Sequence, residues 1–338
     1  MSGTTESAAT EPSADAATTW LAGWRLDAAV VVLSVLMVAG VAWDFRTHAA
    51  GITFAEEGFF TPSHVFFYSA FLLIAATLGA ATYRNRRQGA PWNRAVPEGY
   101  AVGVLGVGLF FVGGAGDYLW HSAFGFEIGV DALTSPTHIL LATGAALFFS
   151  SPLRATWRRS DDGPLAPALV SAGLLLTVPT MFTAYVNPLV QPVAAEAAGG
   201  YVKAGGVAGV IVFTVILSGG MLALVDRFDL PFGAFTLVFA IVGVVNAAVR
   251  PQLVLVPAVV VGGTAADVLV RVLEPSRGRP AALRVFAAVV PAVLFAAYFL
   301  TIAFAWGIAW PVHVWTGSVV LAGAAGLLVS YVSVPDGR

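Results

Sequence analysis

The chain has 338 residues, of which 58% are hydrophobic and 11% are charged, and its formal net charge is −2. Apolar stretches long enough to cross a bilayer fill most of it. This excludes a soluble domain and a nucleic-acid-binding protein, and it indicates a polytopic protein in contact with the lipid bilayer. The chain contains no cysteine, so thiolate metal sites, disulfides, c-type haem attachment and cysteine nucleophiles are excluded. Any metal must be bound by nitrogen and oxygen.

Residues 1–18 are rich in Ser, Thr, Ala and Glu and lack a basic start, so we expect a disordered tail rather than a signal peptide. Ten apolar segments follow, each predicted to be a transmembrane helix: residues 27–47, 61–83, 98–120, 135–153, 165–186, 204–225, 231–249, 252–273, 283–306 and 311–333. The predicted fold class is therefore all-α, a polytopic membrane protein with about ten transmembrane helices. We divide it into the tail (1–18), a duplicated metal-binding four-helix unit (19–160, with repeats at about 27–87 and 100–159) and a six-helix membrane scaffold (161–338).

Arginine follows each even-numbered segment. The basic loops contain Arg84, Arg86, Arg87 and Arg94, then Arg154, Arg158 and Arg159, then Arg227, and finally Arg271, Arg277, Arg279 and Arg284. Because such loops stay in the cytoplasm, they predict a multi-pass plasma-membrane protein with both termini cytoplasmic. Arg46, Lys203 and Arg250 are exceptions to this pattern.

A pattern of metal-ligand residues occurs twice in the first four segments. An Asp and a His lie four residues apart and a second His begins the next segment: first Asp44, His48 and His64, then, about 73 residues later, Asp117, His121 and His138. Each second His ends a similar tetrapeptide, Thr61-Pro62-Ser63-His64 or Ser135-Pro136-Thr137-His138. This repetition predicts a duplicated helix hairpin. All five histidines, including His313 in the last segment, fall at the outer ends of predicted helices, which predicts an outward-facing polar centre.

Helix geometry suits these residues to metal binding. An Asp and a His at positions i and i+4 share one helix face. Thr61 and Ser135 are expected N-caps with proline at the first helical position, which places His64 and His138 in the first turn. There the helix dipole disfavours imidazolium and leaves the neutral ring that a metal requires.

Two imidazoles and one carboxylate form a recurrent site for zinc and non-haem iron and also suit copper. Alternatively, each Asp orients a ligating His, and the four repeated histidines share one ion or a close pair. His313 would add a fifth imidazole. The alternative to metal binding is that these histidines only form hydrogen bonds at the membrane interface. For His313 this alternative is favoured by the flanking aromatic residues Trp306, Trp310 and Trp315.

An Asp-x3-His pair followed by a His at the start of the next transmembrane helix resembles the copper site in the C subunit of particulate methane and ammonia monooxygenases. The resemblance covers segments one to four. It implies that Asp44, His48 and His64, and equally Asp117, His121 and His138, are copper ligands. Copper is therefore the expected cofactor, with zinc and iron as alternatives.

The leading interpretation is a membrane metalloprotein of oxidative type, such as a metal-dependent oxidoreductase, an oxygenase-like protein or an electron-transfer subunit. A small or apolar substrate would reach the metal from the bilayer, and other membrane subunits or an electron donor would be partners. The alternatives are a transporter whose acids and imidazoles bind a travelling cation or proton, and a b-type haem protein with two histidine ligands. Nucleotide-binding and common hydrolase motifs do not occur in the chain.

Two further expectations concern acidic residues. The outer loops carry Glu56, Glu57, Glu127 and Asp131 among phenylalanines, and we expect these loops to lie in the interface and roof the site. Asp267 and Arg271 are four residues apart, which predicts an ion pair within one helix.

Overall fold

The computed structural model describes residues 21–49, 58–127, 129–159 and 163–333, without the side chains of residues 48 and 49. The predicted tail and the residues Glu56 and Glu57 lie outside the described part. The described residues form helices joined by short loops, with one isolated β-bridge between Ser276 and Arg279. The all-α fold class is therefore confirmed.

The helices are α1 (Gly23–Ala49), α3 (Pro62–Arg87), α4 (Trp92–Ala95), α5 (Ala101–Phe124), α6 (Val130–Thr134), α7 (Pro136–Phe149), α8 (Ser151–Arg158), α9 (Ala166–Phe182), α10 (Gly200–Val225), α11 (Ala234–Val249), α12 (Val256–Leu273), α13 (Pro280–Ala305) and α14 (Val312–Ser333). Short 3-10 turns lie at Val193–Ala195 and Leu253–Leu255. Each predicted apolar segment overlaps a helix or a helix pair in this order, and the count of ten membrane crossings stays a prediction.

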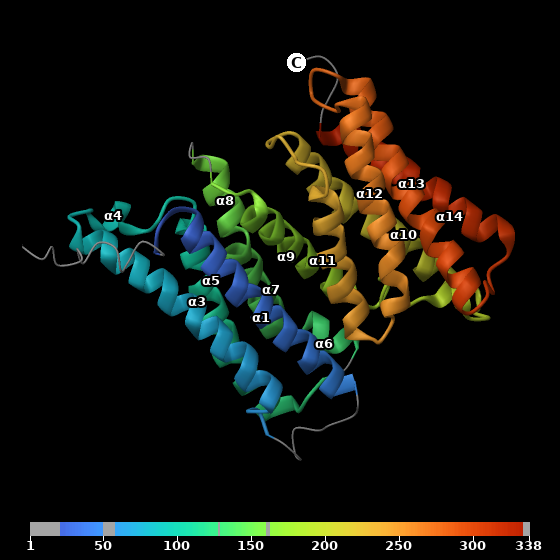
Figure 1. The fold of residues 1–338 in the computed structure, drawn as a ribbon. Coiled ribbons are helices and arrows are strands. Elements are labelled where there is room, and N and C mark those ends of the chain that lie inside the picture. Colours follow the sequence, from blue (N-terminus) through green and yellow to red (C-terminus); the bar gives the residue numbers. More distant parts are fainter. Residues whose placement is uncertain (1–20, 50–57, 128, 160–162, 334–338) are drawn as a thin grey trace, which may run out of the picture.

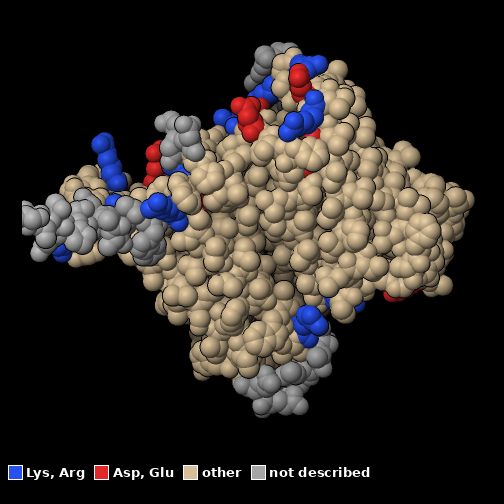
Figure 2. All heavy atoms as spheres, viewed as in Figure 1, with Lys and Arg blue, Asp and Glu red and all other residues tan. Residues whose placement is uncertain are grey.

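Eight spans in the described residues are long and apolar enough to cross a membrane, and α7 and α8 together form one of them, Pro136–Arg158. The helices α9 and α11 are apolar but shorter, with 17 and 16 residues. Figure 2 shows a broad belt of uncharged surface, with most charged side chains gathered toward the upper and lower edges. Because hydrocarbon cannot solvate charges, this belt and the eight spans support a multi-pass membrane protein.

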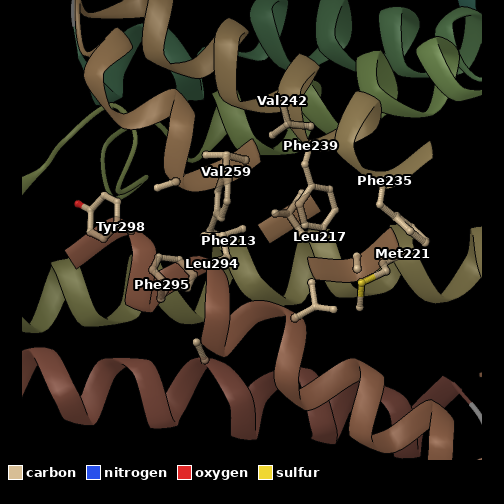
Figure 3. Packing of buried hydrophobic residues seen from close by; sticks show 14 of the residues in the cluster. Phe213, Leu217, Met221, Phe235, Phe239, Val242, Val259, Leu294, Phe295 and Tyr298 are labelled. Carbon is tan, nitrogen blue, oxygen red and sulfur yellow. The ribbon is translucent and has the colours of Figure 1, made fainter. Parts of the chain in front are cut away.

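The helices form two groups with separate apolar cores. The first core lies between α1, α3, α5, α7 and α8, and the second lies between α10, α12, α13 and α14, with α9 and α11 between the groups (Figure 1). The second core contains Phe213, Phe239 and Phe295 from three different helices, all fully buried among aliphatic side chains (Figure 3). The first group contains all of the twice-repeated ligand residues that the structure describes.

The break between α7 and α8 shows how the two groups meet. Pro152 lacks the N–H that would continue the helix ladder. Ser171 of α9 bridges the interrupted turn, because its hydroxyl donates to the Phe149 carbonyl at 2.5 Å and accepts from the Leu153 N–H at 3.1 Å. This buried serine fixes α9 against the first group.

A buried polar anchor ties the first group together at one end. The Asp27 carboxylate is fully buried, accepts a hydrogen bond from the Tyr100 hydroxyl at 2.6 Å and pairs with the Arg159 guanidinium at 2.5 Å. These residues belong to the starts of α1 and α5 and the end of α8. Removal of Asp27 or Arg159 would leave a buried charge unpaired, so we expect it to destabilise the fold strongly.

Glycines allow α5 and α7 to lie unusually close. A Cβ added at Gly106 would lie 2.6 Å from the Gly144 carbonyl oxygen, and one at Gly144 would lie 2.7 Å from the Gly106 carbonyl oxygen. Small residues on both facing surfaces are the usual basis of tight helix pairs in membranes. This contact aligns the hairpin that carries His121 and His138.

Candidate metal centre

The site lies where α1 and α5 end and α3 and α7 begin, which we call the histidine end of the first group. The two helix starts are capped as predicted: the Thr61 hydroxyl accepts from the His64 N–H at 3.1 Å, and the Ser135 hydroxyl accepts from the His138 N–H at 3.3 Å. Proline follows each cap. The capped starts hold both histidines in the first turn of their helices.

The second set of predicted ligands converges tightly. The ligand atoms of Asp117, His121 and His138 all lie within 4.8 Å of one another. The Nε2 atoms of His121 and His138 lie 3.4 Å and 3.2 Å from the same oxygen, Oδ1 of Asp117. The Asp117 and His121 side chains are almost fully buried, whereas His138 is about one quarter exposed, at 26%. Three ligands of two types, one carboxylate and two imidazoles, therefore face a common point and suit a divalent metal.

In the first set, the structure describes the side chains of Asp44 and His64 but not that of His48. The His64 Nε2 lies 3.3 Å from Oδ1 of Asp44. The Ser63 hydroxyl donates to the same oxygen at 2.7 Å. The second set has the equivalent contact, from the Thr137 hydroxyl to Oδ1 of Asp117 at 3.3 Å. The hydroxyl residue before each second His is thus part of the site, a role that sequence reasoning missed although the matching tetrapeptides pointed to it.

The second nitrogen of two imidazoles is held by backbone. His64 Nδ1 lies 2.5 Å from the Phe59 carbonyl oxygen, and His121 Nδ1 lies 2.9 Å from the Gly125 carbonyl oxygen. A carbonyl can only accept a hydrogen bond, so Nδ1 carries the proton in both rings. Each Nε2 is therefore directed at an aspartate oxygen. It bears either a second proton or a lone pair that needs a cation between it and the carboxylate.

Aromatic side chains join the two sets. The Phe59 ring centroid lies 4.8 Å from that of His64 and 6.3 Å from that of His121, and Phe126 lies 6.0 Å and 4.8 Å from the same two rings. The Tyr68 hydroxyl of α3 donates to Oδ2 of Asp117 on α5 at 3.4 Å. The first hairpin therefore contributes directly to the site of the second, a role for Tyr68 that the sequence pattern did not indicate.

One cavity of about 220 Å³ is lined by the described side chains of both sets. Its polar end is lined by Asp44, His64, Asp117, His121, Glu127 and His138. Elsewhere its lining is mostly apolar and includes Phe67, Phe110, Leu141, Ala145, Phe149 and Met181. Among the described residues that line it, none is lysine or arginine. Three carboxylates thus share a largely apolar space with imidazoles as the only basic side chains, and charge balance requires protons or metal cations.

The remaining predicted residues lie elsewhere. His313 is exposed at the start of α14, which packs against α10 and α13 in the second group, and it does not line the cavity. Asp131 is also exposed, on α6. Glu127 lines the cavity wall itself, although the sequence suggested only a roofing loop for it.

No protein-family model matches the sequence, and no curated protein or solved structure matches it either.

Proposed function

We propose that this protein is an integral membrane metalloprotein that binds a metal cation at the histidine end. Copper is the first candidate, from the motif resemblance, and zinc and iron are the alternatives. The observation that carries the proposal is the direction of the imidazoles. Two Nε2 atoms face one carboxylate oxygen of Asp117, while the Nδ1 of His121 donates to backbone. Metal-ligating histidines typically have their other ring nitrogen held in this way.

An arrangement without metal would need at least one extra proton. His121 would have to be an imidazolium ion, because its Nδ1 donates to the Gly125 carbonyl while its Nε2 faces Oδ1 of Asp117. The His138 ring could stay neutral, because the Ser135 hydroxyl at its Nδ1 can donate as well as accept. Burial disfavours a charged imidazole. A single divalent cation satisfies Asp117 and two neutral imidazoles without a buried imidazolium ion, which is why we favour metal binding.

The proposal includes duplication of the helix hairpin. Gly40 of α1 lies against Phe67 of α3, and Gly113 of α5 lies against Leu141 of α7 in the same way. The buried apolar residues of α3 also recur 74 positions later as buried residues: Phe67, Ala70, Phe71, Ile74, Leu78 and Ala81 correspond to Leu141, Gly144, Ala145, Phe148, Pro152 and Ala155. Shared packing positions, in addition to shared ligands, support two copies of one supersecondary unit.

The finer proposal is an oxidoreductase or oxygenase-like function with a small apolar substrate that arrives from the bilayer. Below its polar end the cavity is lined mainly by aliphatic and aromatic side chains, which suit an apolar molecule better than a travelling ion. A groove of about 980 Å³ lies along α1 and α11 and shares Val38 with the cavity. Our proposal is that the substrate enters from the lipid through this groove, past the Val38 side chain that separates it from the cavity, and we therefore rank transport second.

The sidedness is also part of the proposal: a plasma-membrane protein with cytoplasmic termini and the histidine end outside. Because the natural chain has no cysteine, single-cysteine variants can report sidedness without background. We expect Ser122→Cys, at the exposed end of α5, to react with an impermeant maleimide on intact cells. Gln88→Cys, exposed after α3, should react only after the membrane is opened. The reverse labelling pattern would contradict this orientation.

The central test is metal content in purified, detergent-solubilised protein after dialysis. We expect close to stoichiometric metal in the wild type and in His313→Ala, the matched control in the second group. Strong loss is expected in His121→Ala and His138→Ala, because each removes one of three converging donors. Elemental analysis identifies the metal, and an absorption spectrum tests for haem. A wild type free of metal after loading with Cu²⁺, Zn²⁺ or Fe²⁺ would remove the proposal, as would unchanged content in both variants.

A further inference from the structure

Glu127 is a carboxylate of the cavity that the predicted ligand sets do not use. It lies in the short loop between α5 and α6, where Gly125 and Gly129 both have positive φ, at 77° and 67°. Such backbone conformations favour glycine and allow the chain to turn sharply at the helix end. The turn brings Glu127 back to the cavity wall near His138.

The two oxygens of Glu127 have different surroundings. The Trp120 indole N–H donates to Oε1 at 2.9 Å, which holds the carboxylate in one orientation. Oε2 is buried and has no hydrogen-bond partner among the described residues. A buried carboxylate oxygen without a donor is costly, and native structures rarely retain one unless a bound species satisfies it. The described residues therefore supply no donor for this atom.

A water molecule bound to a metal at the neighbouring ligand set would supply this donor. Asp117, His121 and His138 form a compact set within 4.8 Å, and Glu127 stands outside this set but in the same cavity. Three protein ligands leave a coordination position for water or substrate, as in catalytic rather than structural metal sites. We propose that Glu127 faces this position and accepts, through Oε2, a hydrogen bond from a water molecule bound to the metal.

This inference rests on the proposed function and adds a role to it. Glu127 is a positioning residue whose negative charge favours a neutral water over an anion at the metal. It also places a second negative charge near the metal, beside that of Asp117, and this charge favours a divalent ion over Cu⁺. The ligand class of the site is therefore a hydrated divalent cation.

The test uses full-length protein in detergent, loaded with Cu²⁺, and azide as an anionic probe of the exchangeable position. Azide affinity follows from an optical or electron paramagnetic resonance titration. In Glu127→Gln we expect copper to remain bound and azide to bind about tenfold more tightly, because removal of one nearby negative charge changes an interaction of this size. Glu127→Asp keeps the charge and should stay closer to the wild type.

The matched control is Glu98→Gln, an exposed glutamate at the other end of α5. It should leave both copper content and azide affinity unchanged. Normal copper loading with unchanged azide affinity in Glu127→Gln would overturn this inference alone, and so would complete loss of copper in that variant while Glu98→Gln stays loaded. A wild type that binds no metal would overturn the proposed function together with the inference.

Discussion

The first group contains two hairpins, α1 with α3 and α5 with α7. Both make the same contact between an aspartate and a histidine, but they differ in how much open volume lies beside that histidine. In both, an aspartate oxygen contacts the second His, at 3.3 Å for Asp44 and 3.2 Å for Asp117. The difference lies four residues after each of these histidines, where the first hairpin has Tyr68 and the second has Ala142. The Tyr68 side chain reaches across to Asp117, whereas Ala142 lines the cavity.

This difference shows how a pair of similar units can become specialised. The ring of Tyr68 fits against α5 because residue 114 is glycine, where an added Cβ would lie 2.9 Å from the ring. At Ala142 a methyl group leaves room beside His138. Asp117 is also less exposed than Asp44, at 2% against 16% of the side chain. The second hairpin therefore combines the more buried carboxylate with the open space, and we expect it to dominate binding.

We expect the largest effect on metal affinity from substitution of an aspartate, and a larger one for Asp117 than for Asp44. Asp117→Asn should weaken metal binding by at least about 100-fold, because it removes the charge that two imidazoles share in a buried site. Asp44→Asn should weaken binding by a smaller factor, since Asp44 is partly exposed and contacts one described imidazole. Chelator competition on purified protein measures both constants. Equal losses, or a larger loss in Asp44→Asn, would contradict the ranking of the hairpins.

A substitution that fills the open volume beside His138 should have the next largest effect. Ala142→Phe is expected to fill the cavity beside His138 while all metal-facing residues remain. Binding of xenon, an apolar probe of dry cavities, should therefore be lost, with metal content near that of the wild type. Xenon binding can be followed by ¹²⁹Xe nuclear magnetic resonance. Conversely, Tyr68→Ala should enlarge the cavity and retain the signal. Full xenon binding in Ala142→Phe would show that this alanine does not bound the ligand space.

The smallest expected effect concerns the link between the hairpins. Tyr68→Phe removes the hydroxyl that donates to Asp117 at 3.4 Å but keeps the ring. We expect a loss of about 0.5–1.5 kcal/mol in the free energy of unfolding, as for a single hydrogen bond. Thermal unfolding in detergent, with and without metal, measures it. A matched control is Tyr83→Phe, on the exposed part of α3. Similar small losses in both variants would argue against a specific link.

Local features of the site were predictable because near neighbours in the chain create them. The starts of α3 and α7 follow from a hydroxyl cap and a proline, and the structure places Thr61, Pro62, Ser135 and Pro136 accordingly. The i, i+4 spacing of Asp117 and His121 likewise brings their side chains to 3.4 Å. The ends of helices were less predictable: the segment expected to end at residue 186 ends at Phe182, beyond the internal Pro179.

Contacts between residues far apart in the chain could not be predicted from spacing along one helix. Asp267 was expected to pair with Arg271, yet its carboxylate accepts the backbone N–H groups of Phe235 and Thr236 at 2.9 Å and 3.0 Å. Asp267 lies in α12 and thereby caps the free N–H groups at the start of the neighbouring helix α11. The spacing of residues within α12 does not reveal this contact. The Arg271 guanidinium lies over the Phe232 ring instead, 5.7 Å from its centroid.

The sequence by itself determined an all-helical chain that suits a bilayer, because hydrocarbon requires apolar spans whose backbone is bonded within each helix. It also determined which end of each hairpin carries acids and imidazoles, because caps and helical spacing are local. Only the tertiary structure decided which of these groups meet. The close approach of Gly106 and Gly144 and the reach of Tyr68 bring distant helices together, whereas packing against α10 and α13 keeps α14 and His313 away. Such choices depend on the shapes of facing helix surfaces, which one-dimensional spacing does not encode.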